Sequence, residues 1–451
     1  MLIIPANSAL ASGGEVANSL RFNNPSSDYL NKSFGNGNRK TFTISAWVKR
    51  SNIAGIDPIF SRYTADSDSG FLGLYINSNA KLNFTGWNTV YITTNRLFRD
   101  LSAWYHIVLA VDTTQSTNTN RWKLYINGVQ ETSFATAAYP NQNTDLAINQ
   151  NVAHMVGRYS GNYLAGYMSE VVFIDGLALA PDQFGEFDED SNIWKPIKVS
   201  GLTFGNNGFY LDFEDSSALG NDAAGSNNFT ANNLTAIDQS TDTCTNNFAT
   251  INPLIVMNTD TVYSEGNLVM TPGGNTGNWQ IGFSSIAVSA GKWYVETKMI
   301  GGNYVNGISE TTSNQLSASG PEHFIGGFTK EIGYYSQSGN KFVENSQTSY
   351  GASYTNGDII GMALDLDSGT RTITFFKNGA SQGAITLPSS METMTFGMSV
   401  NQGSSSAQFN FGSPPYAISS GNADGNGYGN FEYAVPSGYF SLNTKNLAEY
   451  G

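Results

Sequence analysis

Charged residues, cysteine and long apolar runs are all scarce in this sequence. Only 13% of the 451 residues are charged, and acids outnumber bases enough to give a net charge of −14, which disfavours binding to nucleic acid phosphates. The single cysteine, Cys244, excludes an internal disulfide framework. No run approaches the ~18 apolar residues of a membrane-spanning helix, so we expect no membrane insertion. The first residues also lack the basic and apolar regions of a signal peptide.

Glycine and aromatic residues are abundant instead, and helical periodicity is nearly absent. The 48 glycines accompany 23 tyrosines and 27 phenylalanines, a mixture that suits short strands joined by many turns. Two Asn-Gly pairs, Asn127-Gly128 and Asn378-Gly379, interrupt alternating apolar strands and predict type I′ hairpins. The chain is too long for one ordinary sandwich. We therefore expect an all-β protein with two tandem antiparallel β-sandwich (jelly-roll) domains.

Changes in composition divide the chain into five segments. They predict an N-terminal arm over residues 1–18, a first sandwich over 19–215, a linker or strap over 216–254, a second sandwich over 255–415 and a C-terminal tail over 416–451. The linker or strap is rich in polar residues and has few apolar anchors. One short helix is expected over residues 180–187, because Pro181 suits a first helical turn.

The two strand-rich segments resemble known families. Residues 19–214 resemble the laminin-G branch of the concanavalin A-like sandwiches in Ser19-Leu-Arg-Phe, Trp104-Tyr-His-Ile-Val and Met168-Ser-Glu-Val-Val-Phe. Residues 260–413 resemble a SPRY domain in Gly291-Lys-Trp-Tyr-Val-Glu and Phe375-Phe-Lys-Asn-Gly. The first resemblance implies a jelly-roll that binds glycans or proteins. The second implies a bent sandwich whose loops bind a partner.

Three further stretches resemble the connector and the C-terminal tail of structural proteins of marine bacteriophages, and this resemblance covers nearly the whole chain. The resemblance lies in Phe209-Tyr-Leu-Asp-Phe, in Thr245-Asn-Asn-Phe-Ala-Thr and in Ser437-Gly-Tyr-Phe-Ser-Leu-Asn. It implies a virion component such as a tail fibre, an adhesin or another appendage. The implied partners are other virion proteins and a host cell-surface glycan or protein, and a homo-oligomer is expected. A capsid decoration protein that stabilises the shell is an alternative with the same fold.

Tryptophan side chains are the candidate contacts to a glycan, because an indole offers a flat apolar face with a polar edge. We expect Trp87, Trp122 and Trp279 to be the ligand-binding residues. Trp87 is the foremost of these, since it lies near a turn in the stretch Phe-Thr-Gly-Trp-Asn. Trp47 and Trp293 occur within alternating strands and are expected in the core.

Calcium is the one metal ion that the laminin-G resemblance implies, at the rim of the sandwich. Calcium prefers several oxygen ligands, which flexible loops are able to supply. The oxygen-rich loops contain Asp57, Asp66, Asp68 and Asp112. The alternative is that these four carboxylates are ordinary solvated loop acids. No other cofactor is expected.

Catalysis is not expected. Glucanases of the concanavalin A-like fold carry a Glu-x-Asp-x-x-Glu motif, whose carboxylates serve as nucleophile and acid/base. The nearest match is Glu186-Phe-Asp-Glu-Asp-Ser, in which Ser191 replaces the last carboxylate. A carbohydrate-active enzyme that uses Glu186 and Asp188 therefore remains the alternative to a binding protein.

Overall fold

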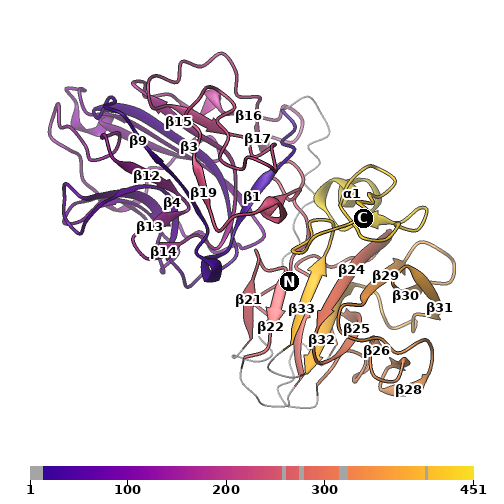
Figure 1. Ribbon diagram of the computed structural model, residues 1–451. Coiled ribbons are helices and arrows are strands. Elements are labelled where there is room, and N and C mark those ends of the chain that lie inside the picture. The colour runs from indigo at the N-terminus through magenta and orange to yellow at the C-terminus, as the bar shows by residue number, and fades with distance from the viewer. Residues whose placement is uncertain (1–13, 256–260, 274–278, 314–322, 402–404) are drawn as a thin grey trace. The chain divides into compact units, whose positions relative to one another are not determined.

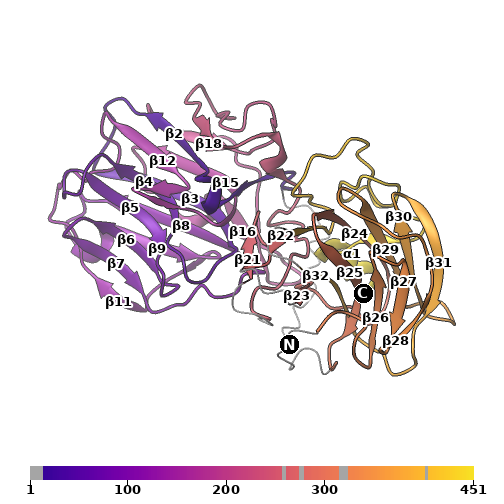
Figure 2. The same ribbon diagram turned by 60° about the horizontal axis from the view of Figure 1, so that its bottom comes forward.

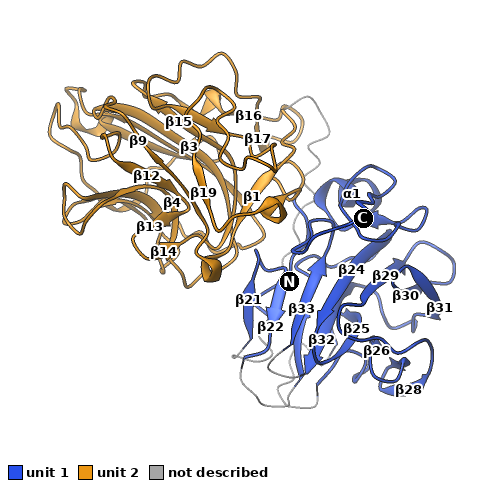
Figure 3. Cartoon of the chain, in the orientation of Figure 1, with its two compact units in different colours: residues 1–8, 247–451 blue, residues 9–246 orange. Residues whose placement is uncertain are grey.

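Two compact units divide the chain between Asn246 and Asn247 (Figure 3). The computed structural model describes residues 14–255, 261–273, 279–313, 323–401 and 405–451. The described residues up to Asn246 belong to unit 2, and those from Asn247 onward belong to unit 1. Each unit contains two large sheets around its own hydrophobic core (Figure 1). The expectation of an all-β protein with two tandem β-sandwiches is confirmed.

One sheet of unit 2 has the strand order β10-β9-β8-β3-β15-β1-β20, and β18 also pairs with β15. The strands are β1 (Ser19–Phe22), β3 (Thr41–Arg50), β8 (Trp104–Asp112), β9 (Trp122–Ile126), β10 (Val129–Gln130), β15 (Gly166–Asp175), β18 (Phe209–Leu211) and β20 (Gln239–Ser240). The register of β15 against β3 shifts between Ser169 and Val172, and Glu170 in this bulge has a φ of 50°. A bulge of this kind turns one side chain away from the alternating pattern of its strand.

The other sheet of unit 2 has the order β11-β7-β6-β5-β4-β12-β2-β19 (Figure 2). Its strands are β2 (Tyr29–Ser33), β4 (Asp57–Tyr63), β5 (Phe71–Ile76), β6 (Leu82–Gly86), β7 (Val90–Thr94), β11 (Phe134–Ala137), β12 (Ala153–Val156) and β19 (Thr230–Asn232). Two small hairpins accompany the sandwich: β13 (Arg158–Tyr159) with β14 (Asn162–Tyr163), and β16 (Gly185–Phe187) with β17 (Trp194–Pro196). The core lies between the sheets and includes Ile44 and Leu109 from one sheet and Leu74 from the other.

Unit 1 is also built from two sheets. The larger has the order β21-β22-β33-β24-β29-β30-β31, with β34 parallel to β24, and the smaller has the order β23-β32-β25-β26-β27-β28. The larger sheet contains β21 (Val262–Ser264), β22 (Val269–Thr271), β24 (Lys292–Ile300), β29 (Ile359–Asp365), β30 (Thr372–Lys377), β31 (Ala380–Thr386), β33 (Ser406–Asn410) and β34 (Phe440–Ser441). The smaller contains β23 (Trp279–Phe283), β25 (Asn303–Glu310), β26 (Glu331–Tyr335), β27 (Asn340–Val343), β28 (Ser346–Ser349) and β32 (Met394–Asn401).

Both predicted Asn-Gly hairpins are confirmed. Asn127 and Gly128 join β9 to β10 with φ angles of 48° and 76°. Asn378 and Gly379 join β30 to β31 with φ angles of 48° and 79°. A type I′ turn requires two positive φ angles, which Asn and Gly accept at little cost.

The segment predicted as a linker or strap, residues 216–254, is shared between the two units. Residues 216–246 belong to unit 2, where they form β19, β20 and the connecting loops. Lys49 lies 2.6 Å from Asp242, and both side chains are almost completely buried. This buried ionic contact and the buried side chains of Leu219 and Phe229 therefore attach the segment to the sandwich, although apolar residues are few along it.

The predicted N-terminal arm and C-terminal tail differ in how far the structure describes them. Most of the predicted N-terminal arm, residues 1–13, lies outside the described residues. The C-terminal tail forms part of unit 1, since β34 pairs with β24 and the helix α1 (Thr444–Tyr450) follows it. The side chain of Asn443 caps α1 by accepting a hydrogen bond from the Asn446 N–H.

The helix predicted over residues 180–187 is wrong. Only the 3₁₀ turn Pro181–Gln183 forms there, because Gly185–Phe187 pairs with Trp194–Pro196 as a strand. The other 3₁₀ turns are Asn24–Ser26, Asn118–Asn120 and Ala236–Asp238. Within the described residues, no helix has the length and apolar character needed to cross a bilayer.

Candidate ligand-binding sites

Trp87 lies on an exposed turn between β6 and β7. The residue is 48% exposed. The Gly86 N–H donates to the Thr89 carbonyl at 2.8 Å and so closes the turn. The Asn88 N–H donates to Asp68 Oδ1 at 2.6 Å and ties the turn to the preceding loop. The indole is therefore presented to solvent on a backbone held by hydrogen bonds at two points.

Trp122 does not have a free ring face. It is 4% exposed, and its Nε1–H donates to the Ala138 carbonyl at 2.8 Å. Its ring stacks on Tyr139 at a centroid distance of 4.6 Å and meets the edge of Phe134. This residue belongs to the core, as alternation within β9 places its side chain inward, and it is removed from the candidate ligand contacts.

Trp279 is half-buried at the start of β23 in unit 1. Its ring centroid lies 5.6 Å from that of Phe324 and 6.2 Å from that of Tyr335. Trp279 thus belongs to a small aromatic cluster of unit 1. Trp87 lies in unit 2, so the two tryptophans belong to different units. Trp47 and Trp293 are buried, with exposures of 3% and 0%.

Asp57 does not fit a calcium site. Its Oδ2 lies 2.6 Å from Arg50 Nε, and both side chains are almost fully buried. Burial raises the pKa of Asp57, although Arg50 and the Ala165 N–H oppose this shift. Oδ1 of Asp57 accepts from the Ala165 N–H at 3.2 Å, so both carboxylate oxygens already have partners within the protein.

The three remaining aspartates are also occupied. Asp66 accepts from the Tyr63 hydroxyl at 2.7 Å, and Asp68 accepts from Asn88. Asp112 accepts from the Thr114 and Gln115 side chains at 2.6 Å each. Burial alone would raise the pKa of Asp112, but these hydrogen bonds outweigh it and lower the pKa.

The four aspartates therefore form no single set of ligands. Asp57 begins β4, Asp66 and Asp68 follow its other end, and Asp112 ends β8 of the other sheet. Within the described residues, no group of three or more His, Cys, Asp or Glu side chains is arranged to hold a metal ion.

Glu186 and Asp188 share one lysine. Lys195 Nζ lies 3.4 Å from Glu186 and 3.0 Å from Asp188. The backbone N–H of Ser191 and then the Lys195 side chain hold the pKa of Asp188 far below its ordinary value. Asp188 also accepts from the Ser191 hydroxyl at 2.9 Å. This arrangement caps a turn, and an ionised Asp188 is unsuited to act as a general acid.

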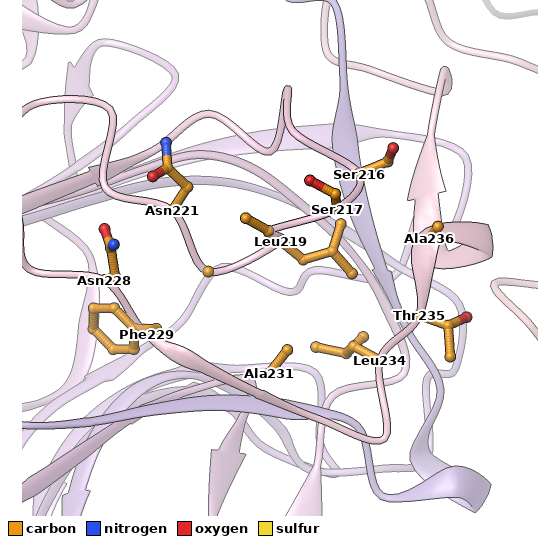
Figure 4. Close-up of a pocket in the computed structure, with 12 residues that line it drawn as sticks. Ser216, Ser217, Leu219, Asn221, Asn228, Phe229, Ala231, Leu234, Thr235 and Ala236 are labelled. Atoms are coloured by element: carbon orange, nitrogen blue, oxygen red, sulfur yellow. The ribbon is translucent and has the colours of Figure 1, made fainter.

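A cavity of about 400 Å³ lies within the strap segment of unit 2 (Figure 4). Figure 4 shows Leu219 and Leu234 approaching each other across the opening, with Ser216 and Ser217 above and Ala231 below. Its volume is near the lower end of the range for small-molecule sites, ~300–1,000 Å³. Composition alone gave no signal for this cavity, because two neighbouring loops of one polar segment, residues 216–221 and 228–236, fold against each other to form it.

A second cavity of about 650 Å³ lies against β15 and β18 in the same unit. Glu170 and Tyr210 line it together with Asp212 and Glu214. Tyr210 donates its hydroxyl hydrogen to Glu170 Oε2 at 2.6 Å. No sequence motif marked Glu170, since the bulge that turns its side chain outward depends on the register between β15 and β3.

Comparison with known families agrees with the two folds. Residues 24–183 match the concanavalin A-like lectin/glucanases superfamily, and residues 268–414 match the SPRY domain. Comparison with the curated proteins finds no match.

Among solved structures, a human SPRY domain is 17% identical with a TM-score of 0.28, covering 36% of this chain and 98% of that chain. The SPRY domain of human HERC1 is 18% identical with a TM-score of 0.28, covering 35% of this chain and 96% of that chain. On the two family matches, the chain carries a concanavalin A-like domain followed by a SPRY domain.

Proposed function

We propose that this chain is a non-catalytic binding protein of a bacteriophage particle, a tail fibre, adhesin or other appendage that holds a host cell-surface glycan or protein. The observation that supports binding is the Trp87 turn. An indole that is 48% exposed on a turn closed by hydrogen bonds offers a pre-formed apolar face. A ligand that stacks there need not order the turn on binding, which lowers the entropic cost.

The low proportion of charged residues in the chain fits a sugar ligand. Only 13% of its residues are charged, while Asn, Ser and Thr are frequent in the loops. Amide and hydroxyl groups are able to bond with sugar hydroxyls, and aromatic rings pack on the apolar faces of sugars. A binding role also agrees with the pairing of Glu186 and Asp188 to Lys195, which commits both of these carboxylates to ion pairs.

The virion role rests on the resemblance of the connector and the C-terminal tail of this chain to those of structural proteins of marine bacteriophages. Those segments include Phe209-Tyr-Leu-Asp-Phe and the C-terminal stretch from Ser437. In this proposal the partners are other virion proteins and a host surface molecule, and copies of the chain assemble as a homo-oligomer.

Electron microscopy of intact particles with a labelled antibody against the chain tests the location. We expect label on the tail or on projecting fibres. Label spread over the head would instead favour a capsid decoration protein, and shell stability would then be the function to measure. Absence of label from the particle would overturn the virion proposal.

A glycan array with the purified protein tests the binding surface. Replacement of Trp87 by Ala should weaken a glycan signal by about tenfold, as truncation of an aromatic contact commonly does. The control is Val129→Ala, because Val129 is 57% exposed on β10 of the other sheet of the same unit. Equal binding by wild type and Trp87→Ala would contradict a role for this turn.

A further inference from the structure

The cavity of about 650 Å³ in unit 2 lies on the face of β15 and β18 that points away from the main core. Val171, Phe173 and Leu211 face that core, so Tyr210 and Val172, their neighbours along the strands, face the other side. The volume falls within the range of small-molecule sites, ~300–1,000 Å³. The side chains around this cavity determine what it is able to hold.

Glu170 supplies a buried carboxylate to the cavity wall. The residue is 8% exposed, and its φ of 50° in the bulge of β15 turns it from the core face. Tyr210 donates to Oε2 at 2.6 Å. Among the described residues, no donor bonds to the second oxygen, Oε1. One acceptor atom of a buried carboxylate is thus left for a ligand.

The charges around the cavity favour a cation. Asp212 and Glu214 line it with Glu170, whereas Lys198 is the one basic residue among the lining residues. Burial, and then the charges of Asp212 and Glu214, raise the pKa of Glu170 to about 7 against the opposing hydrogen bond from Tyr210. A positive group beside Oε1 would offset both the burial and the like charges.

Apolar and aromatic side chains form part of the remaining wall, beside Ser200 and Lys198. Phe204 and Tyr210 line the cavity together with Val199 and Leu202. A ring of hexose size is able to lie against such walls, and an ammonium group on it would be attracted to both the carboxylate and the aromatic faces. A free metal ion would find only one buried carboxylate here, which is too few ligands.

We propose that this cavity binds an amino sugar through its free ammonium group, which donates to Glu170 Oε1. None of the residues that line this cavity belongs to the Trp87 turn. The proposal specifies one class of sugar for the host-binding role, and to that extent it rests on the proposed function. Its test uses soluble sugars and the purified full chain, so failure here leaves glycan binding at Trp87 and the location on the particle untouched.

Titration calorimetry with glucosamine tests the proposal, and N-acetylglucosamine is the matched ligand without the positive charge. We expect saturable binding of glucosamine at neutral pH and at least tenfold weaker binding of N-acetylglucosamine. Glu170→Gln keeps the size of the side chain and should weaken glucosamine binding by about tenfold or more, because a charge-assisted hydrogen bond is lost. Glu189→Gln removes an exposed acid of the same unit that does not line the cavity, and it should change the affinity by less than about threefold.

Several results would overturn the proposal. Wild-type protein that binds neither sugar, or binds both equally, would show that the cavity does not select an ammonium group. Unchanged affinity in a folded Glu170→Gln variant would remove Glu170 from the site. Preferential binding of a lysine amide over glucosamine would reassign the cavity to a protein ligand. If Glu170→Gln does not fold, the comparison of the two sugars on the wild type still decides.

Discussion

His106 should make the stability of unit 2 depend on pH in a direction that its hydrogen bonds determine. Trp194 Nε1–H donates to Nδ1 of His106 at 2.9 Å, so the proton of the neutral ring lies on Nε2, 2.9 Å from the Ser45 hydroxyl. The ring also stacks on Trp47 at a centroid distance of 4.7 Å. A second proton on Nδ1 would face the indole N–H, and burial lowers the pKa of His106 from 6.5 to about 3.

The magnitude follows from proton linkage. The folded pKa is depressed, so the stability contributed by the neutral ring is present above pH 6.5 and is lost as pH falls toward 3. At pH 5, His106 is protonated in the unfolded chain but stays neutral in the folded protein. One depressed histidine should therefore lower the free energy of unfolding by about 2 kcal/mol between pH 7.5 and pH 5.

Urea unfolding of the wild type and of His106→Gln at pH 7.5, 6.5, 5.5 and 5 measures this effect. The substitution should destabilise the protein at pH 7.5 through lost stacking, but its cost should shrink by about 2 kcal/mol at pH 5, because the variant no longer titrates. The difference between the two proteins isolates His106, since all other groups cancel. A difference that stays constant from pH 7.5 to 5 would refute the buried neutral ring.

Two further substitutions have sharp outcomes. Glu331 accepts from Ser309 and Ser313, and burial raises its pKa from 4.5 to about 7. Its contribution to stability is fully present below pH 4.5 and is lost as pH rises through 7. The loss of unfolding free energy caused by Glu331→Gln should therefore be about 2.5 kcal/mol larger at pH 5 than at pH 8 in urea unfolding, and a smaller loss at pH 5 would contradict the raised pKa. Arg50→Met should lower the free energy of unfolding by about 3–5 kcal/mol because it leaves Asp57 buried and unpaired. The double variant Arg50→Met/Asp57→Leu should recover most of this loss, and no recovery would mean that the shape of the pair, not its charge, is what matters.

Residue types and short spacings were sufficient for the fold class and the hairpins. The hydrophobic alternation of Phe42, Ile44, Ala46 and Val48 in β3 was legible because strand periodicity is local. The Asn-Gly turns were equally local, since positive φ angles belong to two adjacent residues. The two family likenesses rested on the same short motifs, and the family matches confirm them.

The candidate site residues were harder to place, because exposure depends on what packs against a side chain. Trp87 and Trp122 both adjoin turns in the sequence, yet Tyr139 and Phe134 cover only Trp122. Asp57 looked like a loop acid, but the distance to Arg50 is a property of the folded chain. Local spacing carries no information on such contacts.

The strap and the Glu170 cavity depended on tertiary structure most of all. Residues 216–246 lack apolar periodicity, and buried contacts such as that of Asp242 with Lys49, 193 residues away, attach them to unit 2. The outward turn of Glu170 follows from a shift in the register of β15 against β3. Hydrophobic pattern and turn chemistry therefore specify which strands form, whereas long-range polar contacts and strand register decide where cavities and free carboxylate oxygens lie, because neither is encoded by neighbours in the chain.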